Sequence, residues 1–133
     1  MQPQPLIAVR DVERSSRWYQ KLLGCTSGHG GQQYEQLLLD GRLLMQLHSW
    51  GDHDHANLGH PDAAAHGYGV LLWFETAQFD EAVARARELN AVIVEEPHVN
   101  RNARHREIWV RDPDGYVVVL ASPYGDTGGD TGG

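Results

Sequence analysis

The sequence contains two tight turns, each lying between two apolar stretches of strand length. The later turn, Asp112 to Gly115, combines a proline of fixed φ with an Asp-Gly pair that accepts positive φ. The earlier turn is Asp40-Gly41. The flanking stretches are rich in residues that favour strands, and they are residues 34–39, 42–47, 105–110 and 116–121. Two similar hairpins in one chain of 133 residues indicate an internal duplication.

The segment before each hairpin is also repeated. The apolar run Leu6–Val9 precedes a helical pattern that Asp11 can cap and Gly24 can end. In the second half, the apolar run Val70–Phe74 precedes a helical pattern that Thr76 can cap. Asn90, which tolerates the left-handed conformation, stands where Gly24 stands in the first half. Each half therefore predicts a strand, a helix and three further strands.

The remaining segments complete the two halves. Residues 25–33 are predicted as a loop or as a weak, bulged strand, residues 91–95 as a strand and residues 97–104 as a loop. The predicted fold is α+β, with two βαβββ modules forming a curved mixed sheet that encloses a cleft. The predicted boundaries are a single domain over 1–124, module one over about 4–50, a linker over about 51–67, module two over about 68–122, and a disordered Gly/Asp/Thr tail over 125–133.

Composition limits the classes of partner. Eleven basic and eighteen acidic residues give a net charge of −7, and no basic stripe is interleaved with aromatic residues, so nucleic acid is not an expected partner. No apolar run is long enough for a membrane span, and the start lacks a signal-peptide pattern, so we expect a cytoplasmic protein that does not bind membranes. The single cysteine, Cys25, excludes an internal disulfide and is interpreted as a small packed residue. Cationic or neutral small molecules fit the acidic chain best.

Three segments together resemble one family. They are Val9 to Gly24, the stretch His48-Ser49-Trp50-Gly51 and the turn Asp112 to Tyr116. From Gln4 to Ser122 the sequence is similar to the vicinal oxygen chelate (VOC) superfamily of glyoxalases, extradiol dioxygenases and bleomycin-resistance proteins. The resemblance implies the fold given above and a homodimer.

The resemblance also implies four positions for the side chains that hold a divalent metal in this family. Carried over one at a time, they are Gln4, Met45, Val70 and Val119. Met and Val offer no oxygen or nitrogen to such an ion. The four positions therefore predict a protein without a metal or other cofactor.

The predicted ligand cleft is apolar and aromatic. Strand alternation is expected to turn Met45 and Leu47 toward the cleft and Gln46 and His48 toward the helix, although a shift of one residue in register would reverse both assignments. The residues predicted to line the cleft are Gln4, Met45, Leu47, Trp50, Val70, Leu72, Trp109 and Val119.

Other polar residues leave further readings open. His105 and Glu107 share a strand face and provide a relocated metal site, although an exposed pair beside Arg104 and Arg106 is the favoured interpretation. The connector offers a second alternative, loose chelation of a transition metal, although a solvated polar loop is the favoured interpretation. The residues concerned are Asp52, His53, Asp54, His55, His60 and His66.

The predicted function is a metal-free small-molecule binder of the sequestering, bleomycin-resistance kind, which takes a cationic or planar ligand. The first alternative is a lyase, isomerase or dioxygenase with ligands relocated around Gln4, His48 or His105. The second is a metal-free enzyme with Glu35 or His48 as general base.

Overall fold

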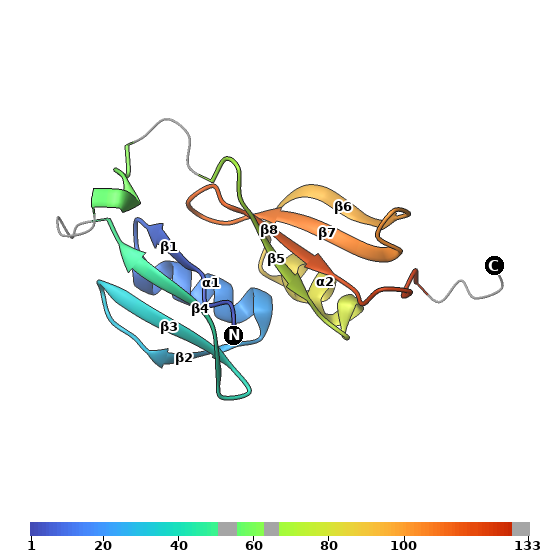
Figure 1. Cartoon of the computed structure of the whole chain (residues 1–133), viewed down its shortest axis with the longest axis horizontal. Coiled ribbons are helices and arrows are strands. Elements are labelled where there is room, and N and C mark those ends of the chain that lie inside the picture. Colours follow the sequence, from blue (N-terminus) through green and yellow to red (C-terminus); the bar gives the residue numbers. More distant parts are fainter. Residues whose placement is uncertain (51–55, 63–66, 129–133) are drawn as a thin grey trace. The chain divides into compact units, whose positions relative to one another are not determined.

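The computed structural model describes residues 1–50, 56–62 and 67–128. The chain divides into two compact units, residues 1–65 and 66–133, and each is described separately below. Both have the same order of elements, which Figure 1 labels.

The first unit has one helix and a four-stranded mixed sheet. Its elements are β1 (Leu6–Val9), α1 (Val12–Leu23), β2 (Thr26–His29), β3 (Tyr34–Leu39) and β4 (Arg42–Ser49), followed by a short 3-10 turn, Ala56–Leu58. The strand order is β1-β4-β3-β2, with β1 parallel to β4 and the other pairs antiparallel. The Gly-rich segment after α1 is therefore a strand, and it is bulged between Ser27 and His29.

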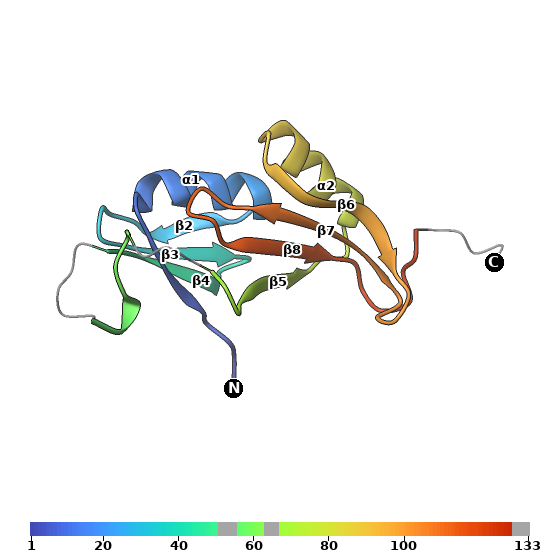
Figure 2. The same ribbon diagram turned by 90° about the horizontal axis from the view of Figure 1, so that it is seen from above.

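The second unit repeats this topology. Its elements are β5 (Leu71–Glu75), α2 (Phe79–Glu88), β6 (Val92–Asn100), β7 (His105–Arg111) and β8 (Val117–Ala121), in the order β5-β8-β7-β6. The predicted α+β fold with two βαβββ modules is confirmed. In Figure 2 the helix of each unit lies over one face of its own sheet. The other face of each sheet is called its open face.

The two helices begin in different ways. As predicted, the Asp11 carboxylate accepts a hydrogen bond from the backbone N–H of Arg14 at 3.0 Å, and Gly24 ends α1 in the left-handed conformation. The predicted cap of α2 was wrong. Gln78 occupies the N-cap position without a side-chain capping bond. The Thr76 hydroxyl, two residues before it, accepts from the Gln78 N–H at 3.1 Å and not from an N–H of the first helical turn.

The register of the first sheet reverses the predicted alternation of β4. Met45 and Leu47, both fully buried, lie on the same face as Glu35, whose carboxylate accepts a hydrogen bond from Ser16 of α1. They therefore belong to the core beneath α1 and do not face a cleft. The open face carries Gln46 instead, whose side chain bonds Tyr34 of β3 and the backbone oxygen of Gln4. This arrangement leaves the polar side chain outside the core.

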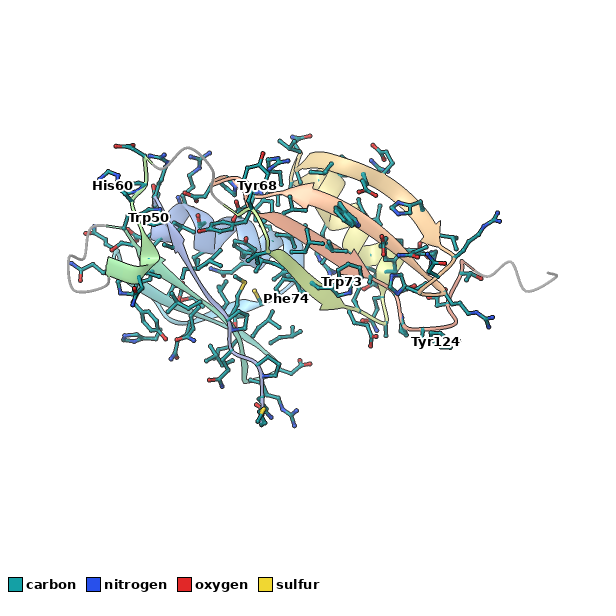
Figure 3. All side chains as sticks on the ribbon, turned by 45° about the horizontal axis from the view of Figure 1, so that its top comes forward. Trp50, His60, Tyr68, Trp73, Phe74 and Tyr124 are labelled. Atoms are coloured by element: carbon teal, nitrogen blue, oxygen red, sulfur yellow. The ribbon has the colours of Figure 1, made fainter. Side chains whose placement is uncertain are left out.

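The second sheet has a similar division between its faces. Leu72 pairs with Val118, which pairs with Val110, and all three are buried on the face that packs against α2. The predicted cleft position of Leu72 is thus corrected to the helix side. Trp109 and Val119 pair with each other and lie on the open face, where Trp73 of β5 (Figure 3) pairs with Val119.

Two segments near the end of the chain are more ordered than their composition suggests. The predicted loop 97–104 is wrong in its first half, because β6 continues to Asn100. In the predicted tail, the Gly125 N–H donates to the Arg104 oxygen at 2.6 Å, and the Asp126 carboxylate accepts from Arg106 at 3.1 Å. In the described part of the chain, neither helix is long and apolar enough to cross a membrane.

Candidate functional site

A group of polar side chains lies on the open face of the second sheet, where β6 pairs with β7. Its centre is Glu107, whose side chain is only 3% exposed. Three pairs across the two strands bring the group together, and they are Asn100 with His105, His98 with Glu107, and Glu95 with Trp109. We call Glu95, His98, His105, Glu107 and Trp109 the open-face cluster.

A β-bulge in β6 is needed to assemble this cluster. Glu95 and His98 are three residues apart, so in a regular strand they would point to opposite faces. The register shifts between these two residues, beside Pro97, which has no backbone N–H to donate to the ladder. Both side chains consequently lie on the same face as Glu107. Bulges of this kind commonly re-aim a side chain beside a functional site.

The Glu107 carboxylate is held by three donors. His105 Nε2 lies 2.7 Å from Oε2, and Asn100 Nδ2 donates to the same oxygen at 3.4 Å. Trp109 Nε1 donates to Oε1 at 3.1 Å. Burial raises the pKa of Glu107, but the hydrogen bonds from His105, Trp109 and Asn100 outweigh burial and hold the pKa below its ordinary value. The carboxylate is therefore ionised at neutral pH although it is almost inaccessible to water.

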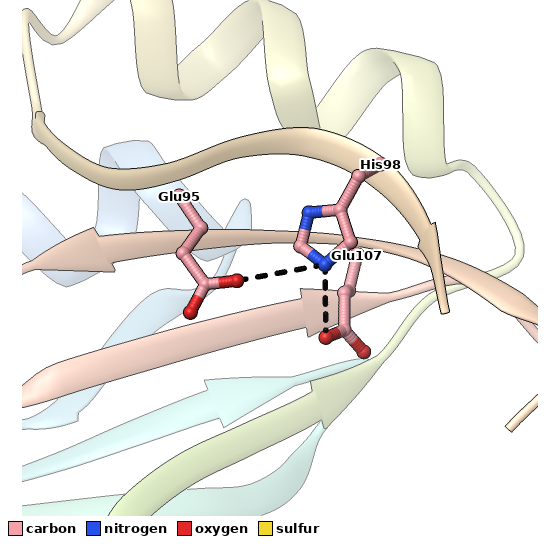
Figure 4. Close-up of side chains that lie close together, drawn as sticks. All are labelled: Glu95, His98 and Glu107. Carbon is pink, nitrogen blue, oxygen red and sulfur yellow. Dashed lines mark ion pairs between the residues drawn. The ribbon is translucent and has the colours of Figure 1, made fainter. Parts of the chain in front are cut away.

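The imidazole of His98 lies between two carboxylates (Figure 4). Its Nε2 is 3.3 Å from Oε1 of Glu107 and 3.5 Å from Oε1 of Glu95. Its Nδ1 is 2.8 Å from the backbone oxygen of Glu96. Within the described ranges 1–50, 56–62 and 67–128, Glu95, His98 and Glu107 form one group of three metal-ligating side chains whose ligand atoms lie within 4.8 Å of one another.

Aromatic side chains continue this face toward β5. The Trp73 ring lies 5.7 Å from the His105 ring, centroid to centroid, and 44% of Trp73 is exposed. Leu71 is exposed to the same extent as Trp73. Leu71 pairs with Val117 and Trp73 pairs with Val119, so both side chains lie on the open face. The open face thus combines a buried anionic centre with exposed apolar surface, which suits a ligand that has both a charged and a planar part.

The four positions carried over from the family do not form a metal site. Met45 lies in the core beneath α1, and Val70 and Val119 have no donor atoms. Gln4 is exposed and offers one amide. A hard or borderline divalent ion requires several oxygen or nitrogen ligands, so this set does not fit one.

The other predicted residues have separate positions. Trp50 follows the end of β4 and is half-buried, and His48 lies on the open face of the first sheet with Nδ1 2.8 Å from the Ser49 oxygen. Glu35 is buried against α1, and its two oxygens accept from Ser16 and Ser27, so a general-base role has no support here. Of the connector, His53, His55 and His66 lie outside the described residues, and the described His60 is exposed.

The cluster differs from the prediction in two respects. His105 and Glu107 were predicted to share a face, and they do, but they are 9% and 3% exposed, so the favoured interpretation of an exposed pair was wrong. Glu95 and His98 were not anticipated as partners, because Pro97 was interpreted as the start of a loop. A proline inside a strand pattern also signals a bulge or an edge strand, and that signal was present in the sequence.

Several solved structures share the fold at sequence identities of 15–18%. A hypothetical protein from S. aureus has a TM-score of 0.72 and 17% identity, covering 92% of this chain and 94% of that chain. A glyoxalase/bleomycin resistance protein/dioxygenase family enzyme from Burkholderia phytofirmans has a TM-score of 0.71 and 18% identity, covering 88% of this chain and 94% of that chain. The fosfomycin resistance protein FosX from Mesorhizobium loti has a TM-score of 0.67 and 15% identity, covering 92% of each chain.

No curated protein sequence matches the chain. The family defined as the Glyoxalase/Bleomycin resistance protein/Dioxygenase superfamily, in contrast, matches residues 2–120, which include every helix and nearly every strand residue described above. The duplicated βαβββ topology and the family match agree. The chain belongs to the Glyoxalase/Bleomycin resistance protein/Dioxygenase superfamily, the VOC superfamily.

Proposed function

We propose that this VOC protein binds and sequesters a small molecule that carries a positive charge and a planar group. The observation that supports the proposal is the ionised, almost fully buried carboxylate of Glu107 on a face that also exposes Trp73. A buried charge is costly unless it is paired, and a cationic ligand adds a partner to it. The net charge of −7 attracts cations from a distance.

The ligand is proposed to contact the open face of the second sheet. Of the eight residues predicted to line a cleft, Trp109 and Val119 lie on this face. Val70, which precedes β5, stays in the proposal as a flanking position, and Gln4 and Trp50 of the first unit remain predictions. The four family positions are proposed to hold no metal. The protein is further proposed to act as a homodimer, as the family resemblance implies, and to be located in the cytoplasm.

Tryptophan fluorescence provides the test. Metal-free bleomycin, a cationic probe with planar rings, is expected to bind with a dissociation constant of about 1 μM or lower and to change the emission of Trp109. Fosfomycin, a small anion, is expected to bind more weakly because the site is already negative. The bound probe is expected to be recovered unchanged after long incubation.

Two matched variants give the test its control. Trp109→Phe removes the indole N–H that donates to Glu107, so binding should weaken and the emission change should become smaller, with Trp73 on the same face as the remaining reporter. Trp18→Phe alters a tryptophan of α1 that packs edge-on against Tyr19 at 4.8 Å, and it should leave binding unchanged. Equal responses in both variants, or no response to any planar cation, contradict the proposal.

The alternative function is an enzyme of the glyoxalase or dioxygenase kind. It is favoured by the 2.7 Å contact between His105 Nε2 and Glu107, because a carboxylate that orients an imidazole is a common arrangement for proton transfer. Structural neighbours also include a protein described as a glyoxalase-related enzyme from Fulvimarina pelagi, with a TM-score of 0.71 and 15% identity. Chemical conversion of a recovered ligand by the unmodified protein would select this alternative.

A further inference from the structure

The contacts of His98 differ from those of an ordinary ion pair. Its Nδ1 faces a carbonyl oxygen, which can only accept, so Nδ1 carries a proton and donates. In a neutral imidazole, Nε2 is then left with its lone pair, and that lone pair faces the carboxylates of Glu95 and Glu107. Three electron-rich atoms converge on one point, and this arrangement requires a positive centre.

A proton on Nε2 of His98 is a poor positive centre for these two carboxylates. One N–H donates one good hydrogen bond, whereas two carboxylates compete for it at 3.3 and 3.5 Å. Charge-assisted hydrogen bonds are usually about 2.7–2.9 Å long. The cluster contains one such short contact, the 2.7 Å distance between His105 and Glu107. The atoms around His98 Nε2 are thus spaced more widely than in a hydrogen-bonded pair.

A divalent ion fits the same spacing. Ligand atoms about 2.1 Å from an ion, at angles between 90° and the tetrahedral value, lie roughly 3.0–3.4 Å from one another. The separations of 3.3 and 3.5 Å between Nε2 and the two carboxylate oxygens agree with this geometry. The two oxygens, which lie within 4.8 Å of each other, complete it by a small approach of the exposed Glu95 side chain. One imidazole and two carboxylates suit a borderline divalent metal such as zinc.

The surrounding contacts resemble the outer shell of a metal site. A metal-ligating histidine usually donates its second ring N–H to a carbonyl or carboxylate, as His98 does to Glu96. The ligating carboxylate is usually held by a further hydrogen bond, as Glu107 is by His105 and Trp109. The bulge beside Pro97 brings the third ligand, Glu95, to the same face.

We propose that Glu95, His98 and Glu107 bind one divalent transition metal ion, of the zinc class, on the open face of the second sheet. These residues are different from the four positions carried over from the family. Because Glu95 is exposed, the ion has coordination positions open to solvent, and an oxygen atom of a small-molecule ligand can occupy one of them. The inference goes beyond the proposed function, because in the metal-bound protein the ion, and not a cationic group of the ligand, pairs with the Glu107 carboxylate. It replaces the expectation of a chain without metal.

Metal content of the protein purified without a histidine tag tests the inference. After removal of metal by a chelator and dialysis, Zn²⁺ is expected to rebind at one ion per chain, measured by elemental analysis and titration calorimetry. His98→Ala and Glu95→Gln should each weaken zinc binding by more than about 100-fold, since both remove a ligand. Glu95 is exposed, so its variant tests the site even if another variant fails to fold. His105→Ala should weaken binding by about 10- to 100-fold through the orientation of Glu107.

A connector variant separates this site from loose chelation elsewhere. Replacement of His53, His55, His60 and His66 by Asn should leave the stoichiometry at one and the affinity unchanged. If this variant loses the ion while Glu95→Gln retains it, or if wild-type protein binds no zinc at micromolar concentration, the inference is overturned. Bleomycin binding by the metal-free protein is measured separately, so the two proposals can fail independently.

Discussion

At the scale of single residues, two buried glutamates lie on opposite faces of their sheets. Glu35 lies beneath α1, and both its oxygens accept from serine hydroxyls of the same unit. Glu107 lies on the open face, where histidine, tryptophan and asparagine side chains surround it. Both are 3% exposed, so burial alone does not distinguish the carboxylate beneath the helix from the one proposed to bind a ligand. The distinction depends on which face of the sheet the side chain occupies.

The single cysteine is a residue for which a pH dependence is expected. Burial is the main cause that raises the pKa of the Cys25 thiol from 9.0 to about 11. At pH 8 the reactive thiolate should therefore be roughly 100-fold scarcer than in the unfolded chain. Iodoacetamide labelling, followed by mass spectrometry, should be slow in the native protein and should accelerate as the pH rises toward 11. Rapid labelling of native protein at pH 8 would contradict the packed position.

At the scale of elements, the ends and irregularities of helices and strands determine what the sheets present. The bulge in β6 brings Glu95 to the face of His98, and another irregularity lies between Leu37 and Leu38 of β3. The helices differ at their starts, because Asp11 caps α1 whereas Gln78 provides no side-chain bond to α2.

A pair of capping variants tests this difference. Asp11→Ala removes the acceptor for the Arg14 N–H and should lower the free energy of unfolding by about 1 kcal/mol. Gln78→Asp supplies a good capping residue and should raise it by about 0.5–1 kcal/mol. Urea unfolding monitored by circular dichroism measures both changes. Destabilisation by Gln78→Asp would show that α2 begins at a different residue.

At the scale of the whole molecule, the two units repeat one topology but differ on their open faces. The first has amides and aromatic side chains, with Tyr34 bonded to Gln46 and Gln36. The second has the ionised cluster around Glu107. A duplicated fold thus supports one face with an ionised carboxylate beside imidazole side chains and one with neutral polar groups.

The C-terminal segment provides a test at this scale. Asp126 accepts from Arg106, and its backbone oxygen accepts from the Ser122 hydroxyl at 2.9 Å. A chain that ends at Tyr124 loses both contacts and should melt at a lower temperature than a chain that ends at Gly128, as measured by calorimetry. Equal melting temperatures would mean that these hydrogen bonds contribute no stability and that the tail behaves as its composition predicts.

The sequence by itself determined the element order, because the signals for it are local. The turns at Asp40-Gly41 and Asp114-Gly115, the Asp11 cap and the left-handed residues Gly24 and Asn90 depend only on residues that are near one another in the sequence. The predicted bounds of β1 and β3 therefore agree with the structure.

Only the tertiary structure decided which face of each strand is buried. An alternating pattern looks the same after a shift of one residue, and the choice for Met45 against Gln46 was made by packing beneath α1. A bulge adds one residue without changing the local composition. The convergence of Glu95, His98 and Glu107 therefore depended on pairing between strands, which the order of residues alone does not reveal.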